Sequence, residues 1–347
     1  MRPRSEASCF CSGNGSVRTT SFTDRREDRR VRLAAMDAES LVQRILEGDR
    51  RAVARAISMV EDGADDLPEL SAGLYAHTGD GYTIGLTGSP GVGKSSLAQH
   101  LVRMARERDL TVAVLAIDPT SPFTGGALLG DRLRMQSHAT DPGVFIRSMA
   151  TRGHLGGMAL AAPEAIRILD ASGKDVVVIE TVGVGQAEVE VATATDTTLV
   201  VVSPGWGDAV QVAKAGILEI ADVFAVNKSD KEGAGEAARD LRQMVKMGPD
   251  RDWAPPVVLT SASTGDGTEE LWEAIEGHRK HQESTGALED KRRHRIVEEV
   301  ERMVGLQLQS RAAQLVAESG LLEDLAARRI DPYRAAAKLV ERLGRTS

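Results

Sequence analysis

The stretch "GLTGSPGVGKSS", residues 85–96, decides the fold of this chain. It follows the start of an apolar run, "YTI", and leads into "LAQHLVRMARER", which has the pattern of an amphipathic helix. Gly88 is followed by four residues and then by Gly93, Lys94 and Ser95, which fits the spacing G-x-x-x-x-G-K-[ST]. A glycine-rich turn between a strand and a helix points backbone N–H groups inward, and the helix N-terminus adds a positive end. The stretch therefore predicts a phosphate-binding loop.

Each residue type in this loop has an expected part in binding phosphate. Lys94 can reach the β- and γ-phosphates, and the Ser95 hydroxyl is placed to bind Mg²⁺. The alternative is a glycine-rich turn that matches by chance, but the strand before it and the helix after it argue against that. The residues expected to cradle the phosphates are Gly88, Ser89, Pro90, Gly91, Val92, Gly93, Lys94, Ser95 and Ser96.

Outward from this loop, short apolar runs alternate with longer amphipathic stretches. Continuous Val/Ile runs separated by helical stretches indicate a mainly parallel sheet that is covered on both faces. The sequence thus predicts an α/β fold, a P-loop NTPase with a mainly parallel central sheet flanked by helices and with N- and C-terminal helical extensions. The predicted strands are "YTIGLT", "TVAVLAID", "VFIRS", "VVVIE", "TLVVVS", "VFAVN" and "PVVLT".

The chain divides into four expected parts. Residues 1–36 carry eight Arg before Met36 and little that could form a core, so we expect a disordered tail or a start codon assigned too early. Residues 37–80 read as an N-terminal helical extension in which Asp49 can cap a helix. Residues 81–280 form the P-loop domain. Residues 281–347 form a C-terminal helical arm, with Asp331 and Pro332 opening its last helix.

The arm has an apolar stripe that must be covered. Ile296, Val297, Val300, Met303 and Val304 recur at helical spacing. The stripe either packs back onto the domain or forms a dimer interface, and the sequence leaves both open.

Composition excludes several classes of function. The net charge of −8 gives no support to nucleic-acid binding, which needs a basic surface. No apolar run approaches the roughly 20 residues of a membrane helix, so we expect no membrane partner and a cytoplasmic protein. Cys9 and Cys11 are the only cysteines, which excludes a disulfide scaffold and argues against a cysteine-based metal site.

A second motif predicts which base is bound. The run "VFAVNKSD" ends in Asn227, Lys228, Ser229 and Asp230. A carboxylate at the fourth position can accept hydrogen bonds from N1–H and the amino group of guanine, whereas adenine offers no such pair of donors. We expect Lys228 to lie along the base and Asn227 to tie this loop to the phosphate loop.

The stretch "TSASTGDG", residues 260–267, completes the predicted base site. It supplies Ser261 and Ala262, whose turn is expected to offer a backbone N–H to guanine O6. Either motif alone would be weak, but their order and spacing after a P-loop predict guanine.

The segment between these motifs predicts a nucleotide-sensitive switch. Asp118 ends a strand, Asp131 follows a glycine-rich stretch, and Glu180 ends the strand "VVVIE" where a metal-binding aspartate is usual. Glu180 could bind Mg²⁺ directly or through water. Gly183 could offer its N–H to the γ-phosphate, and Gln186 could orient the attacking water. For Gln186 the alternative is a surface residue on the next helix.

No residue stands out as a charge-stabilising arginine. Arg134, Arg147 and Arg152 are candidates, each with a structural role as the alternative. A partner protein could instead complete the site.

The motifs together resemble the MeaB/ArgK/MMAA family of GTPases. The similar stretches are "GSPGVGKSS", "DPTSPFTGGALLGDRLRM", "RGHLGGM", "IETVGVGQAEVEVA", "PGWGDAVQVAKAGILEIADVFAVNKSD" and "DPYRAA", and the likeness spans about residues 41–343. The glutamate at position 180 belongs to the pattern of that family. Thr120 and Ser229 are small departures from it.

The resemblance implies a function that composition could not indicate. It implies a G-protein chaperone of an adenosylcobalamin-dependent acyl-CoA mutase, typically methylmalonyl-CoA mutase, which uses GTP to gate cofactor loading and to protect the mutase. It also implies a homodimer formed through the C-terminal helices. By position, Ser95, Asp118, Asp131 and Glu180 are the implied Mg²⁺ ligands.

Three other classes of function would each require a different sequence feature. A transport-associated arginine/ornithine kinase would use ATP, which conflicts with Asp230. A nickel metallochaperone GTPase would need Cys or His ligands near the switch. A ParA/MinD-like ATPase would need an additional early lysine where Ser89 and Pro90 stand.

Overall fold

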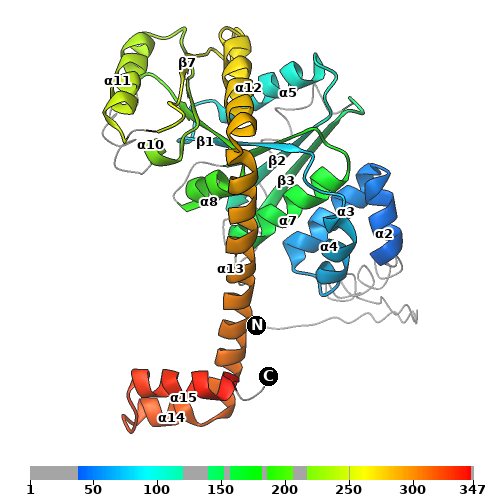
Figure 1. The fold of residues 1–347 in the computed structure, drawn as a ribbon, viewed down its shortest axis with the longest axis vertical. Coiled ribbons are helices and arrows are strands. Elements are labelled where there is room, and N and C mark those ends of the chain that lie inside the picture. The colour runs from blue at the N-terminus through cyan, green and yellow to red at the C-terminus, as the bar shows by residue number, and fades with distance from the viewer. Residues whose placement is uncertain are drawn as a thin grey trace, which may run out of the picture.

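The centre of the protein is a seven-stranded parallel sheet (Figure 1). The computed structural model describes residues 38–119, 140–151, 157–181, 186–205, 217–249 and 251–344. All seven predicted strands are confirmed, and their order across the sheet is β3-β2-β4-β1-β5-β6-β7. The strands are β1 (Tyr82–Thr87), β2 (Val112–Pro119), β3 (Val144–Thr151), β4 (Val176–Thr181), β5 (Thr197–Val202), β6 (Val223–Val226) and β7 (Val257–Leu259).

Helices cover both faces of the sheet, because alternate strand residues point in opposite directions. On β2, Val112 and Val114 join a core with α5 and α12, whereas Ala113 and Leu115 join a core with α3 and α7. The helices are α2 (Ala38–Leu46), α3 (Arg50–Asp62), α4 (Leu67–Tyr75), α5 (Lys94–Arg106), α7 (Gly157–Ala171), α8 (Gln186–Ala194), α10 (Ile217–Ile220), α11 (Ala234–Met247), α12 (Thr268–Thr285), α13 (Ala287–Glu318), α14 (Leu321–Ala326) and α15 (Pro332–Gly344).

The N-terminal helices are built into the same core as the sheet. Asp49 caps α3 as predicted, since its side chain accepts hydrogen bonds from the backbone N–H groups of Arg51 and Ala52. Leu41 of α2 and Ile57 of α3 are fully buried against α7 and the sheet. The predicted tail, residues 1–36, lies outside the described residues.

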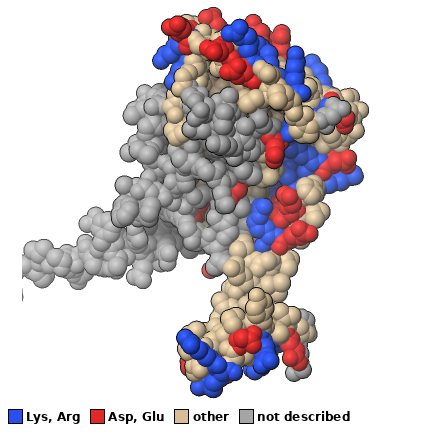
Figure 2. All heavy atoms as spheres, turned by 90° about the vertical axis from the view of Figure 1, so that its left-hand side faces the viewer, with Lys and Arg blue, Asp and Glu red and all other residues tan. Residues whose placement is uncertain are grey.

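In the predicted C-terminal arm, residues 281–347, the helices α13, α14 and α15 extend away from the sheet and end in the α14–α15 hairpin (Figure 1). Arg334 N donates to Asp331 Oδ1 at 3.0 Å, which confirms the predicted cap of α15. The predicted apolar stripe on α13 is between 39% and 54% exposed, so the possibility that it packs back onto the domain is wrong. Figure 2 shows uncharged surface along the arm between its root and its far end.

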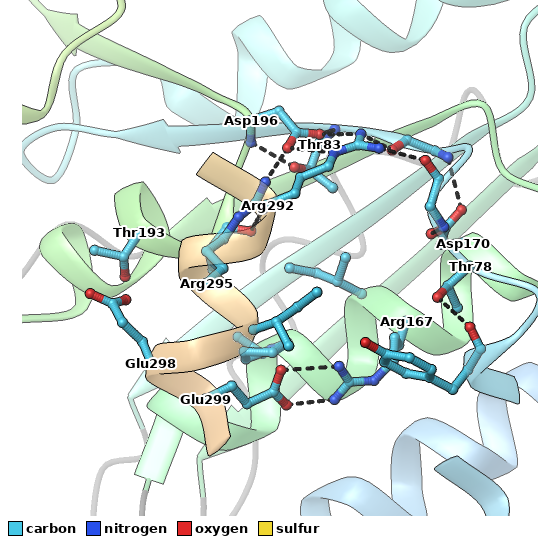
Figure 3. A pocket seen from close by; sticks show the side chains of 18 of the residues that line it. Thr78, Thr83, Arg167, Asp170, Thr193, Asp196, Arg292, Arg295, Glu298 and Glu299 are labelled. Atoms are coloured by element: carbon cyan, nitrogen blue, oxygen red, sulfur yellow. Dashed lines mark hydrogen bonds and ion pairs between the residues drawn. The ribbon is translucent and has the colours of Figure 1, made fainter. Parts of the chain in front are cut away.

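The root of the arm is held by a buried carboxylate. Asp196, immediately before β5, is 1% exposed and accepts hydrogen bonds from Arg292 Nη2 at 2.8 Å and from Arg295 (Figure 3). Burial alone would raise the pKa of Asp196, but the two guanidinium groups and the Thr83 N–H outweigh it and lower the pKa to about 2. One turn further along α13, Glu299 pairs with Arg167 of α7. These ion pairs join α13 to the sheet and to α7.

A cavity of about 340 Å³ lies under this part of α13, between α7, α8 and the turn before β1. Its polar side chains largely satisfy one another. Asp196 binds two arginines, and Asp170 accepts the N–H groups of Gly79 and Gly81. The cavity is therefore best described as the joint between arm and domain (Figure 3).

A buried histidine near this joint makes the fold sensitive to acid. His278 of α12 is 3% exposed, its Nδ1 lies 2.8 Å from Thr197 Oγ1, and its Nε2 lies 3.5 Å from an Asp222 carboxylate oxygen. Burial lowers the pKa of His278 from 6.5 to about 4, because the Asp222 charge does not fully offset the loss of hydration. The folded protein therefore holds this imidazole neutral at pH 5–6.

We expect the free energy of unfolding to fall as the pH drops from 7 to 5. In this range the unfolded chain binds a proton at His278 and the folded chain does not, so stability decreases by about 1–2 kcal/mol. Urea unfolding at several pH values should show this slope in the wild type, and the slope should flatten in His278→Gln. His294, whose side chain is 75% exposed, provides the control variant His294→Gln, which should keep the slope. An unchanged slope in His278→Gln would contradict the assignment.

Candidate nucleotide-binding site

The phosphate cradle, residues 88–96, lies at the carboxyl end of β1 and runs into α5. Two of its glycines are required by close contacts. A Cβ at Gly88 (φ +135°) would lie 2.1 Å from the Val201 carbonyl oxygen, and one at Gly93 (φ +101°) would lie 2.2 Å from Asn227 Nδ2. Any side chain at these positions would push the loop away from β5 or from the base motif. The cradle and the base motif are thus in direct contact.

Lys94 is the first residue of α5 and is almost fully buried, at 5% exposed. Its Nζ donates to the carbonyl oxygens of Gly88 at 2.6 Å and Ser89 at 3.1 Å. The ammonium group therefore lies inside the curve of the loop, beside the backbone that was predicted to hold phosphate. Pro90 and Gly91 form the exposed tip of the loop, and Val92 is buried beneath it.

Ser95 and Glu180 meet at the foot of the cradle. Ser95 Oγ donates to Glu180 Oε1 at 2.5 Å, and both side chains are at least nine-tenths buried. They meet because β1 and β4 are neighbours in register, with Leu86 opposite Glu180. A hydroxyl and a carboxylate are hard oxygen ligands of the kind Mg²⁺ prefers, so the pair fits the predicted metal site.

The rest of the predicted metal and switch residues are placed only in part. Asp118 lies near the end of β2, which pairs with β4, but its side chain is not among those described. Gln186 begins α8, and its side chain is likewise outside the description. Asp131 and Gly183 lie outside the described residues altogether. Among the described residues, no group of three or more His, Cys, Asp or Glu could hold a metal ion.

One of the three candidate arginines is structural. Arg147 Nη2 donates to Glu61 Oε2 at 2.6 Å and to Ser58 Oγ at 2.7 Å, which ties β3 to α3. This confirms the structural alternative for Arg147. Arg134 and Arg152 lie outside the described part of the chain.

Asn227 joins the base motif to the cradle. Its side chain is 1% exposed, Nδ2 donates to the Val92 carbonyl oxygen at 2.7 Å, and Oδ1 accepts the Ala262 N–H at 3.0 Å. Lys228 follows in the left-handed region (φ +61°), and its Nζ donates to the Gly91 carbonyl oxygen at 2.7 Å. One asparagine thus connects three loops that lie far apart in the sequence.

Asp230 presents its carboxylate at the surface beside Ser261. Ser261 Oγ donates to Asp230 Oδ1 at 2.8 Å, and this hydrogen bond is the main reason that the pKa of Asp230 is lowered. The carboxylate is therefore ionised at neutral pH and can accept hydrogen bonds. The Ala262 N–H, which was expected to meet guanine O6, donates to Asn227 here. A contact that sequence analysis missed is that of His100 with the Ala262 carbonyl oxygen.

These features define a class of protein. A parallel sheet with a glycine-rich loop after β1, a Lys-Ser pair at the start of α5 and an Asn-Lys-Ser-Asp motif after β6 is a P-loop NTPase fold. Among the described residues, the longest helices are too polar to cross a membrane.

Comparison with known proteins gives the family. The family model described as "Methylmalonyl Co-A mutase-associated GTPase MeaB" matches residues 53–317, and the chain belongs to this family of GTPases. A protein of Pyrococcus abyssi, provisionally named as a GTPase, is 48% identical over 313 residues, which cover 88% of this chain and 96% of that protein. The family predicted from the motifs is therefore confirmed.

Two further similarities concern domain organisation and fold. The fused isobutyryl-CoA mutase of Cupriavidus metallidurans is 37% identical over 252 residues, which cover 69% of this chain and 23% of that protein. The crystal structure of an LAO/AO transport system kinase has a TM-score of 0.68 at 24% identity, covering 88% of this chain and 97% of that one. The second likeness confirms the P-loop NTPase fold.

Proposed function

We propose that the chain binds GTP in the cradle and hydrolyses it to GDP and phosphate. The observation that carries this proposal is the position of Asn227, which hydrogen-bonds to the phosphate cradle on one side and to the loop of Ala262 on the other. These contacts support a base site built around Asp230 beside a phosphate site at Lys94. Membership of a GTPase family supports the same nucleotide.

The proposed roles follow the chemistry of each side chain. Lys94 and the inward N–H groups of the cradle hold the β- and γ-phosphates, and the Gly183 N–H adds a donor at the γ-phosphate. Ser95 and Glu180 hold Mg²⁺, with Asp118 and Asp131 as the remaining candidates. Mg²⁺, when bound, supplies positive charge beside the β- and γ-phosphate oxygens.

The attacking water needs a residue to orient it. We assign this part to Gln186, because it begins the helix that follows the strand of Glu180. Its amide can donate to the water and accept from it.

We propose further that the nucleotide state is read by an adenosylcobalamin-dependent acyl-CoA mutase. In this role the chain gates loading of the cofactor and protects the mutase from inactivation, in the cytoplasm. The name of the matching family and the similarity to a fused isobutyryl-CoA mutase support this partner. The exposed stripe on α13 supports a homodimer formed through the arm, because an apolar stripe of this length is usually covered.

The partner can be tested by a pull-down from cells that contain a cobalamin-dependent mutase. The immobilised protein is loaded with GDP or with a non-hydrolysable GTP analogue, and we expect the mutase to be recovered in amounts that differ between the two. Lys94→Ala is the control: it should bind neither nucleotide and recover the same amount under both conditions. Recovery of no mutase in any state, by a wild-type protein that binds GTP, would count against the partner.

The transport-kinase alternative predicts a different nucleotide. A kinase that uses ATP should bind ATP at least as well as GTP, whereas a carboxylate at position 230 disfavours adenine. Competition between the two nucleotides for the wild-type protein separates these functions.

A further inference from the structure

The base loop, residues 260–267, is a compact turn with defined internal hydrogen bonds. Ser261 N donates to the Asp266 carbonyl oxygen at 2.9 Å, and Gly265 N donates to the Ser261 carbonyl oxygen at 2.7 Å. Gly267 (φ +71°) closes the turn where a Cβ would lie 1.9 Å from the Leu259 carbonyl oxygen. The loop therefore has a defined internal conformation. Its position relative to the rest of the protein depends on its hydrogen bonds to residues outside the loop.

Both backbone polar groups of Ala262, its N–H and its carbonyl oxygen, form hydrogen bonds to residues outside the loop. Its N–H donates to Asn227 Oδ1 at 3.0 Å, and its carbonyl oxygen lies 2.9 Å from His100 Nε2. A carbonyl oxygen can only accept, so His100 Nε2 carries the proton. Since the two bonds restrain the peptide groups before and after the Cα, together they restrain φ and ψ of Ala262.

His100 lies on α5, the helix that begins with the phosphate-site residues Lys94 and Ser95. Its ring also lies against the base loop, because a Cβ at Gly265 would be 3.6 Å from His100 Cε1. The phosphate helix and the base loop are therefore joined by a side chain that sequence spacing gave no reason to single out.

We propose that His100 is a positioning residue for base selection. By fixing the Ala262–Ser263 peptide against α5, it sets the direction of the Ser263 N–H, which we assign as the donor to guanine O6. This inference rests on the proposed function, since it concerns selectivity at the same nucleotide site. His100 contacts the loop through the Ala262 carbonyl oxygen, so we expect its effect only for a base that carries an oxygen at position 6.

The test compares GDP with the diphosphate of 2-aminopurine riboside, which keeps the 2-amino group and the phosphates but has neither O6 nor the N1–H of guanine. The missing N1–H weakens binding equally in the wild type and the His100 variants, so the change caused by each variant is compared within one nucleotide. In His100→Ala, GDP affinity should fall by about 5- to 10-fold, the size expected for one lost hydrogen bond. Affinity for the 2-aminopurine nucleotide, followed by its fluorescence, should stay within about 2-fold. His100→Gln retains a donor at a similar reach and should recover most of the GDP affinity. The exposed His294→Ala serves as the matched control.

A second measurement follows the loop itself. Amide hydrogen exchange in residues 260–267 of the GDP complex should speed up in His100→Ala and stay near wild type in His100→Gln. Equal losses for both nucleotides, or unchanged GDP affinity in His100→Ala, would overturn the positioning role while leaving the proposed function intact. A wild-type protein that fails to bind GDP overturns both.

Discussion

Replacing Asp230 by asparagine should change the preferred base from guanine to xanthine. The carboxylate is ionised and exposed at the proposed base site, and in that proposal it accepts from N1–H and the 2-amino group of guanine. Asparagine keeps one acceptor and gains a donor, which matches the N1–H and the C2 carbonyl of xanthine. GDP affinity should therefore fall by about 10²- to 10⁴-fold while XDP affinity rises, because a polar group left unpaired at a base site is strongly selected against.

The measurement is competition of GDP and XDP for a fluorescent nucleotide on the wild type and on Asp230→Asn. Asp240→Asn removes the same charge from an exposed position on α11 and should leave both affinities unchanged. Full guanine selectivity in Asp230→Asn would mean that the base binds elsewhere. In Asp230→Asn, Ser261 can still donate to the side-chain oxygen at position 230. If this variant nevertheless lost binding to every nucleotide, the carboxylate would have a structural role instead.

The second large effect is expected at the root of the arm, where Asp196→Asn should reduce the free energy of unfolding by about 3–5 kcal/mol. The substitution keeps the shape of the side chain but leaves Arg292 and Arg295 without the anion they surround. Their side chains are 24% and 20% exposed, so water can compensate them only in part. Urea unfolding followed by circular dichroism measures the loss.

An exposed ion pair on the arm provides the comparison. Asp324 pairs with Arg329, and both side chains are largely accessible to water. Asp324→Asn should change stability by less than about 1 kcal/mol. If Asp196→Asn were no more destabilising than Asp324→Asn, the Asp196 ion pairs would not be what fastens α13 to the sheet.

Much of the fold could be predicted because its signals are local. Each strand is a continuous run such as Val176–Thr181, and each cap lies beside its helix, as Asp49 and Asp331 do. The contact between Asn227 and the cradle was predicted as well, and both motifs follow the carboxyl ends of strands in one parallel sheet. The roles proposed for these residues in binding GTP and Mg²⁺ remain predictions.

What could not be predicted depends on pairs that are distant in sequence. Asp196 meets Arg292 and Arg295 only because α13 crosses the start of β5, and none of the three belongs to a motif. His100 and Ala262 are also distant in sequence. Ala262 belongs to the predicted base motif, but nothing in the sequence pairs it with His100 of α5. The sequence does not indicate that the arm extends away from the domain, because an apolar stripe does not reveal which surface covers it.

The length of α13 gives the joint at Asp196 a mechanical consequence. An uninterrupted helix of 32 residues is about 48 Å long, and among the described residues its ion pairs to Asp196 and to α7 lie between Arg292 and Glu299. The 19 residues beyond Glu299 span roughly 28 Å, so a rotation of roughly 5° at the ion pairs moves the far end of the helix by about 2.5 Å. A rotation of α13 that is too small to separate Arg292 from Asp196 thus becomes a larger displacement at the far end of the helix, where a neighbouring molecule could bind.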